Sequence, residues 1–132
     1  MTSKFGVEIE YVGFGGDRTS AVAALNGDGY TVVNENWNRY ITRDFWKVVS
    51  EPSVYRGGEL ISPPLPYTSD GLEHFGGMMR RLRDNGANMS ASCGMHVHVD
   101  ASFLAGLERT MIRNFFEYLL SAYRQNEHLF DR

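Results

Sequence analysis

Two pairs of potential metal ligands occupy alternating positions in the sequence. Glu8 and Glu10 are separated by one residue, and so are His96 and His98. In a β-strand the side chains of residues i and i+2 point to the same face, so each pair presents two ligands together if its segment is a strand. Two neighbouring carboxylates repel each other unless a cation or solvent compensates their charge. Carboxylate oxygens are the ligands that Mg²⁺ and Mn²⁺ prefer, and a neutral imidazole is an acceptable further ligand.

Either pair alone is also compatible with a solvated sheet surface. An alternating Glu pair commonly faces water without a ligand, whereas an alternating His pair is less common without one. The histidines follow Cys93-Gly94, and the glycine lets other groups approach the backbone closely. The presence of both pairs therefore favours a metal site. Asp100 shares the face of His96 and His98, but no role is assigned to it.

The segments that carry these residues have strand patterns, and helical patterns follow them. Apolar and polar residues alternate in the first segment, which is typical of a strand with two unlike faces. Strands are predicted at 5–12, 30–34, 46–50, 59–62 and 95–100. The prolines at 63–66 are predicted to end the fourth strand, because proline has no amide to donate. Helices are predicted at 21–25, capped by Thr19 or Ser20, at about 70–84, capped by Ser69 or Asp70, and at 102–125.

This order of elements predicts an α+β fold in which helices lie on one face of a mainly antiparallel sheet. The 132 residues are enough for one hydrophobic core, so residues 1–132 are expected to form a single domain.

Composition excludes several classes of partner. The net charge of −3 gives no general attraction to nucleic acid or to an anionic membrane, and the arginines at 80, 81 and 83 are expected to form a solvated helix face. No apolar run approaches the ~20 residues that span a bilayer. The single Cys93 cannot form an internal disulfide, so a cytoplasmic location is expected.

Four segments of the chain, taken in order, resemble the amidoligase family of the glutamine synthetase and glutamate–cysteine ligase superfamily. They are residues 5–11 (FGVEIEY), 46–54 (WKVVSEPSV), 58–65 (GELISPPL) and 92–100 (SCGMHVHVD). Each segment alone is weak, but the four in this order are specific. The resemblance implies a sheet like that of the glutamine synthetase catalytic domain.

The resemblance also implies roles for particular residues. Glu8, Glu10 and Glu59 would bind divalent cations, Mg²⁺ or Mn²⁺. His96 would ligate the metal nearest the phosphates of ATP, and His98 would face those phosphates. Where the family often has an aspartate, this chain has Glu51 before Pro52, so Glu51 is given no role.

The implied activity is an ATP-dependent carboxylate–amine ligase. Such an enzyme activates a carboxylate as an acyl phosphate, which an amine then attacks to form an amide or peptide bond. Cations that bridge the phosphate oxygens serve the first step, because phosphoryl transfer depends on positioning and charge neutralisation. The expected substrates are small-molecule or peptide carboxylates and amines. The sequence does not identify the catalytic base.

Two other interpretations remain open. The chain ends at Arg132, soon after the last predicted helix, and we expect it to be the N-terminal portion of an amidoligase catalytic domain. Such a portion could instead be an inactive binding or assembly module, and a homo-oligomer could relieve its exposed sheet edges. A metal-dependent hydrolase would need further ligands. The remaining histidines, His74 and His128, lie in helical patterns and are expected at the surface.

Overall fold

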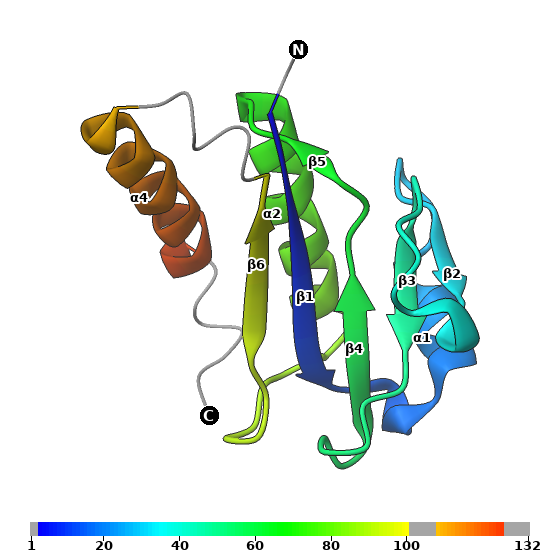
Figure 1. Ribbon diagram of the computed structural model, residues 1–132. Helices are drawn as coiled ribbons and strands as arrows, with labels where there is room; N and C mark the ends of the chain where they lie inside the picture. The colour runs from blue at the N-terminus through cyan, green and yellow to red at the C-terminus, as the bar shows by residue number, and fades with distance from the viewer. Residues whose placement is uncertain (1–2, 101–107, 126–132) are drawn as a thin grey trace.

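The computed structural model describes residues 3–100 and 108–125 (Figure 1), which form six strands and three α-helices. The strands are β1 (Lys4–Val12), β2 (Val32–Asn34), β3 (Trp46–Val49), β4 (Gly57–Ile61), β5 (Leu65–Pro66) and β6 (Met95–Val99). The α-helices are α1 (Arg18–Leu25), α2 (Ser69–Asp84) and α4 (Arg109–Gln125). Two short 3-10 helices are η1 (Phe14–Gly16) and η2 (Asn36–Asn38). None of the helices in the described ranges is long and apolar enough to cross a membrane.

Strand β1 lies inside the sheet and has partners on both of its edges. On one edge it pairs antiparallel with β4 through residues 8–12 and with β5 through residues 4–5. On the other edge it pairs antiparallel with β6 through residues 5–9. Beyond β4 lie β3 and then β2, and the β2–β3 pair is parallel. The predicted α+β class with a mainly antiparallel sheet is therefore confirmed.

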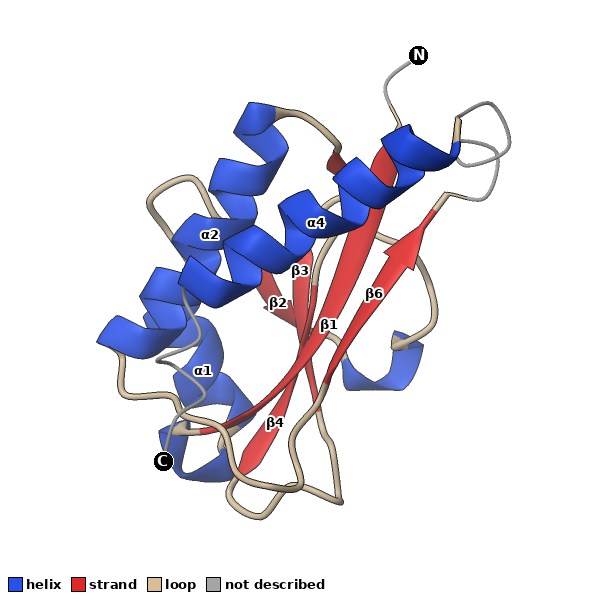
Figure 2. Ribbon diagram, turned by 90° about the vertical axis from the view of Figure 1, so that its left-hand side faces the viewer, coloured by secondary structure: helices blue, strands red, loops and turns tan. Residues whose placement is uncertain are grey.

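All three α-helices lie on one face of the sheet, while η2 lies on the opposite side (Figures 1 and 2). Alternation along β1 explains this layering, because its apolar residues point to the helices and are at most 3% exposed. Helix α2 covers them with the apolar stripe that its helical spacing predicts. The core residues of these two elements are Phe5, Val7, Ile9, Tyr11, Leu72, Phe75, Met78, Met79 and Leu82.

The predicted helix caps were each placed too late in the sequence. Asp17 caps α1, because its carboxylate accepts hydrogen bonds from the Thr19 amide (3.1 Å) and the Ser20 hydroxyl (2.7 Å). Thr68 caps α2 by accepting a hydrogen bond from the Gly71 amide. Both helices begin directly after the first suitable polar residue, which apolar periodicity alone does not identify.

The fourth strand, β4, ends at Ile61 before the prolines, as predicted, but pairing with β1 resumes within the proline-rich segment, which was not predicted. Residues 65–66 form β5, because the residues flanking the prolines supply the ladder bonds. The Ser62 amide donates to the Val7 carbonyl (2.9 Å), and the Tyr67 amide donates to the Ser3 carbonyl (2.8 Å). The first part of the predicted last helix, residues 102–107, lies outside the described residues.

The expectation that His74 lies at the surface is wrong. Its ring is half-buried and accepts a hydrogen bond at Nε2 from Trp46 Nε1 (3.0 Å), with the Tyr30 ring centroid 4.4 Å away. Since α2 lies across the sheet, one side of the His74 ring contacts Trp46 at the start of β3. His128 lies outside the described residues. Arg80 and Arg83 are exposed, as expected, but Arg81 is half-buried and donates to the carbonyls of Leu25 (2.8 Å) and Asn26 (3.1 Å) at the end of α1.

Candidate metal centre

The face of the sheet away from the α-helices carries the four predicted metal ligands and also His98, which was predicted to face the nucleotide phosphates. Because the odd-numbered residues of β1 face the core, Glu8 and Glu10 face away from it. The strand register places Glu59 opposite Glu10, and His96 opposite Glu8. His98 lies opposite Gly6. Residues directly opposite each other share a face, so the three strands bring these side chains to one polar surface.

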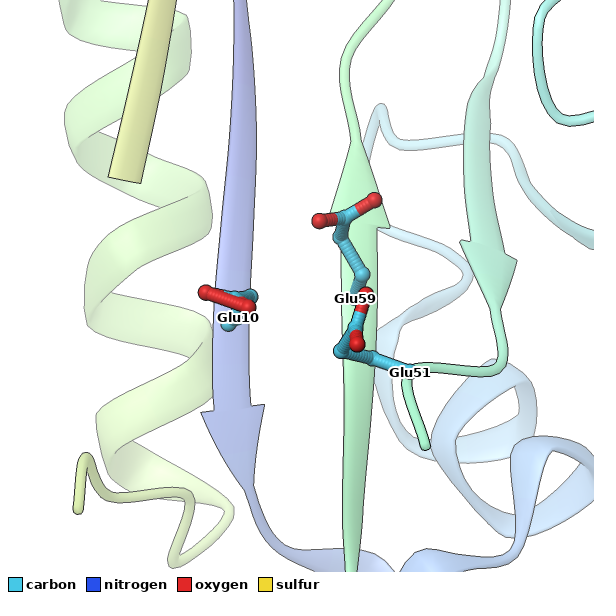
Figure 3. A group of neighbouring side chains, drawn as sticks. All are labelled: Glu10, Glu51 and Glu59. Carbon is cyan, nitrogen blue, oxygen red and sulfur yellow. The ribbon is translucent and has the colours of Figure 1, made fainter. Parts of the chain in front are cut away.

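Three carboxylates meet on this surface and form the acidic cluster, defined here as Glu10, Glu51 and Glu59. One oxygen of each lies within 4.8 Å of the others, and Figure 3 shows the three side chains side by side. They come from β1, from the loop after β3 and from β4. Oxygen ligands drawn from separate elements suit a hard cation such as Mg²⁺ or Mn²⁺, so the donor set fits the metal that the family resemblance implies.

Glu59 is the buried member of the acidic cluster, with 4% of its surface exposed. Burial raises the pKa of its carboxyl above the ordinary value, the negative charge of Glu8 raises it further, and Arg39 opposes both effects. The pKa of Glu51 is lowered, chiefly because the Ser53 hydroxyl donates to the carboxylate (2.7 Å) and the Ser53 amide also does so. The acidic cluster therefore contains one carboxyl group, Glu51, whose charged form is favoured by its hydrogen bonds, and one, Glu59, whose charged form is disfavoured by burial.

Arg39 supplies the positive charge that compensates the acidic cluster. Its Nη2 lies 2.6 Å from Glu59 Oε1 and 3.8 Å from Glu51 Oε2. Its Nη1 donates to the carbonyl of Ser50 at 3.1 Å. Such charge-assisted bonds are the stronger class of hydrogen bond, so in this arrangement of the site the Arg39 guanidinium is held at the acidic cluster.

Lys47 holds the loop that presents Arg39. It lies on β3 between buried residues, and its side chain is 2% exposed. Lys47 is opposite Ile61, which is itself opposite Glu8, so its side chain points to the same polar face of the sheet as Glu8. Its ammonium donates to three carbonyls of the loop, those of Asn38 (2.7 Å), Arg39 (3.0 Å) and Ile41 (2.6 Å). Burial lowers the pKa of Lys47, while the nearby Glu35 carboxylate opposes that shift.

A second pair of polar side chains, Glu8 and His98, lies on the same face as the acidic cluster. His98 Nε2 forms a hydrogen bond with Glu8 Oε2, an ion pair when the imidazole is protonated. His96 is exposed on the same face. Within the described part of the chain, neither Glu8 nor the histidines belong to the group of three ligands that can share one metal ion. Of the predicted metal ligands, Glu10 and Glu59 thus lie in the acidic cluster and Glu8 pairs with His98, whereas His96 lies in neither group among the described residues.

A cleft of about 470 Å³ adjoins the Glu8–His98 pair. Its floor includes Gly6, Ser62 and Pro64, and residues 39–43 form a wall. The absence of a side chain at Gly6 keeps the floor low, since the nearest atom to an added Cβ would be Ser62 Oγ at 3.7 Å. Arg39 belongs to both the cleft and the acidic cluster.

Three residues of this site were missed from the sequence. Glu51 was given no role, although it lies in a segment that carries the family resemblance. Lys47 had a detectable signal, a single charge in the apolar strand Trp46–Val49. Arg39 had none, because it lies in an irregular loop and only the folded sheet brings Glu59 to it.

Comparison with known proteins agrees with the sequence resemblance. No curated protein and no solved structure matches the chain. A family model described as "putative amidoligase enzyme" matches residues 1–129, nearly the whole chain. The chain belongs to this amidoligase family.

Proposed function

We propose that this chain carries the metal- and nucleotide-binding surface of an ATP-dependent carboxylate–amine ligase. The observation that carries the proposal is the acidic cluster, whose three oxygens lie within 4.8 Å on the open face of the sheet. Membership of the amidoligase family supports amide or peptide bond formation as the reaction, and the acyl-phosphate intermediate is part of the proposal.

The acidic cluster would hold Mg²⁺ or Mn²⁺ through Glu10, Glu51 and Glu59. When bound, a divalent cation there supplies charge neutralisation to the phosphate oxygens of ATP. Glu8 and His96 share the same face and are proposed as further ligands on its β6 side. The carboxylate-rich set favours this activity over a hydrolase built on paired imidazoles, because zinc sites of that kind use nitrogen ligands.

His98 and the adjoining cleft are proposed to face the nucleotide. The Glu8 carboxylate holds one imidazole nitrogen of His98, which fixes the orientation of the ring. Lys4 and Arg43 line the same cleft and can attract a phosphate or a substrate carboxylate. The substrates proposed for the complete reaction are a small-molecule or peptide carboxylate and an amine.

Thermal unfolding with Mg²⁺ and ATP tests this proposal. A ligand present at ~100 times its Kd stabilises the native state by about 2.7 kcal/mol, so the melting temperature of the wild-type chain should rise clearly. Glu10→Gln should abolish the rise, because it removes one charge from the acidic cluster. Glu73→Gln is the matched control, since Glu73 lies on α2 and pairs with Arg80, away from the site. A wild-type melting temperature that ignores Mg²⁺ and ATP would refute the proposal.

A further inference from the structure

A cation bound in the acidic cluster would compete with Arg39 for the carboxylate oxygens of Glu59 and Glu51. Its Nη2 is 2.6 Å from Glu59 Oε1, and the second nearby carboxylate oxygen, on Glu51, is at 3.8 Å. Mg²⁺ binds oxygen at about 2.0–2.1 Å, and it shares its ligands poorly with a second cation at hydrogen-bond distance. The guanidinium and a divalent cation thus compete for the same two members of the acidic cluster.

The same side chain also borders the cleft. Arg39 is one of the residues that line it, and its Cζ lies 5.7 Å from the centre of the Tyr40 ring. Its side chain is 24% exposed, so it is partly in contact with solvent while it lines the cleft. A change of side-chain rotamer can therefore carry the charge from the cluster to the cleft.

The backbone of Arg39 has less freedom than its side chain. The buried ammonium of Lys47 binds the carbonyl of Arg39 and the carbonyls of Asn38 and Ile41. These three bonds keep the loop in place whether or not the guanidinium contacts Glu59. The movement available to Arg39 is consequently that of the side chain alone.

We propose that Arg39 is an exchangeable counter-ion, which neutralises the acidic cluster until a divalent cation displaces its guanidinium into the cleft, where it binds an anionic group of the substrate. This inference rests on the proposed function, because it requires a metal in the acidic cluster. It adds that metal loading prepares the anion site, so that the metal binds before the phosphate or carboxylate.

Mn²⁺ binding, measured from the electron paramagnetic resonance signal of the free ion, tests the first half. Arg39→Gln removes the competing charge and should bind Mn²⁺ about tenfold more tightly, a difference of about 1.4 kcal/mol. The titration is done at pH 8 to limit proton binding to the carboxylates. Arg80→Gln is the matched control, because Arg80 lies on α2 and pairs with Glu73, away from the site, and should leave Mn²⁺ affinity unchanged. Arg39→Lys keeps the charge with one donor group, so its affinity should be intermediate.

Inorganic tripolyphosphate, titrated by calorimetry at saturating Mn²⁺, tests the second half. Here Arg39→Gln should bind the anion at least several-fold more weakly than the wild type. Opposite effects on the two ligands distinguish this exchange from general damage to the fold, which would weaken both. Weaker or equal Mn²⁺ binding by Arg39→Gln would overturn the exchange, and so would unchanged tripolyphosphate binding.

The two proposals fail in different ways. If neither the wild type nor Arg39→Gln binds Mn²⁺, the metal site itself is refuted and the exchange falls with it. If the wild type binds Mn²⁺ and the Glu10→Gln variant does not, the metal site is supported. The behaviour of Arg39→Gln then decides the exchange alone.

Discussion

Replacing Lys47 by methionine should destabilise the fold and release the loop that presents Arg39. Methionine keeps most of the apolar stem but removes the ammonium, which donates to three loop carbonyls at 2.6, 2.7 and 3.0 Å. Each hydrogen bond from a charged donor contributes roughly 1.5–3 kcal/mol, so three set an upper bound of about 4.5–9 kcal/mol.

The expected loss is smaller than this bound for two reasons. Burial lowers the pKa of Lys47, which means that placing its charge in the sheet already costs free energy that the variant recovers. The loop residues at 40–42 are exposed, so water can reach the carbonyls if the loop lifts. We therefore expect a loss of about 3 kcal/mol in the free energy of unfolding, a large part of the ~5–15 kcal/mol that stabilises a typical domain.

Urea denaturation followed by tryptophan fluorescence measures this loss. Lys4→Met is the matched control, because Lys4 is exposed on the same polar face of the sheet and should change stability by less than about 0.5 kcal/mol. A loss below about 1 kcal/mol for Lys47→Met would show that the three bonds do not hold the loop. Arg39 would then lack the fixed backbone that the exchange proposal requires.

Two further predictions concern the cleft and the pH dependence of stability. Gly6→Leu should fold, since an added Cβ finds only Ser62 Oγ at 3.7 Å, but its longer side chain should fill the cleft floor and weaken tripolyphosphate binding, whereas Gly6→Ala should weaken it less. Burial lowers the pKa of His74 below its ordinary 6.5, so the unfolded chain binds the proton more readily. Its contribution to stability should thus be complete above pH 6.5 and should fall as the pH drops from 6.5 toward the folded pKa. Denaturation midpoints at pH 7.5 and 5.5 should differ less in His74→Gln than in the wild type, and equal differences would contradict the assignment.

Local sequence patterns were sufficient for most of the elements but not for their ends. Alternation in residues 5–12 identified β1 to within one residue, because one of its faces is fully buried. The same rule placed Glu8 and Glu10 on one face. It could not find β5, whose pairing depends on amides outside the prolines, nor the parallel contact between β2 and β3, which joins segments through space.

The site required the strand register, which no local pattern contains. Glu59 contributes to the acidic cluster because it lies opposite Glu10, and shifting β4 by one residue would turn it into the core. His96 and His98 were correctly placed on the polar face, where both are exposed, but the pairing of His98 with Glu8 was not predicted. Whether these five residues bind a metal or a nucleotide stays a prediction until the titrations are made.

Lys47 is a sequence signal for the conformation of the loop before β3, which has no alternating pattern of its own. A lysine among the buried residues of β3 is unfavourable unless carbonyls or carboxylates surround its charge, so its presence there requires such partners. The partners are supplied by residues 38–41, six to nine positions earlier in the chain. That constraint fixes the backbone of Arg39, while its guanidinium is held separately by Glu59 and the Ser50 carbonyl. The loop can therefore stay in place when a cation competes for Glu59. Mn²⁺ affinity should accordingly respond to Arg39→Gln in a chain whose Lys47 is intact, and should respond less in Lys47→Met, where the loop no longer holds the arginine against the acidic cluster.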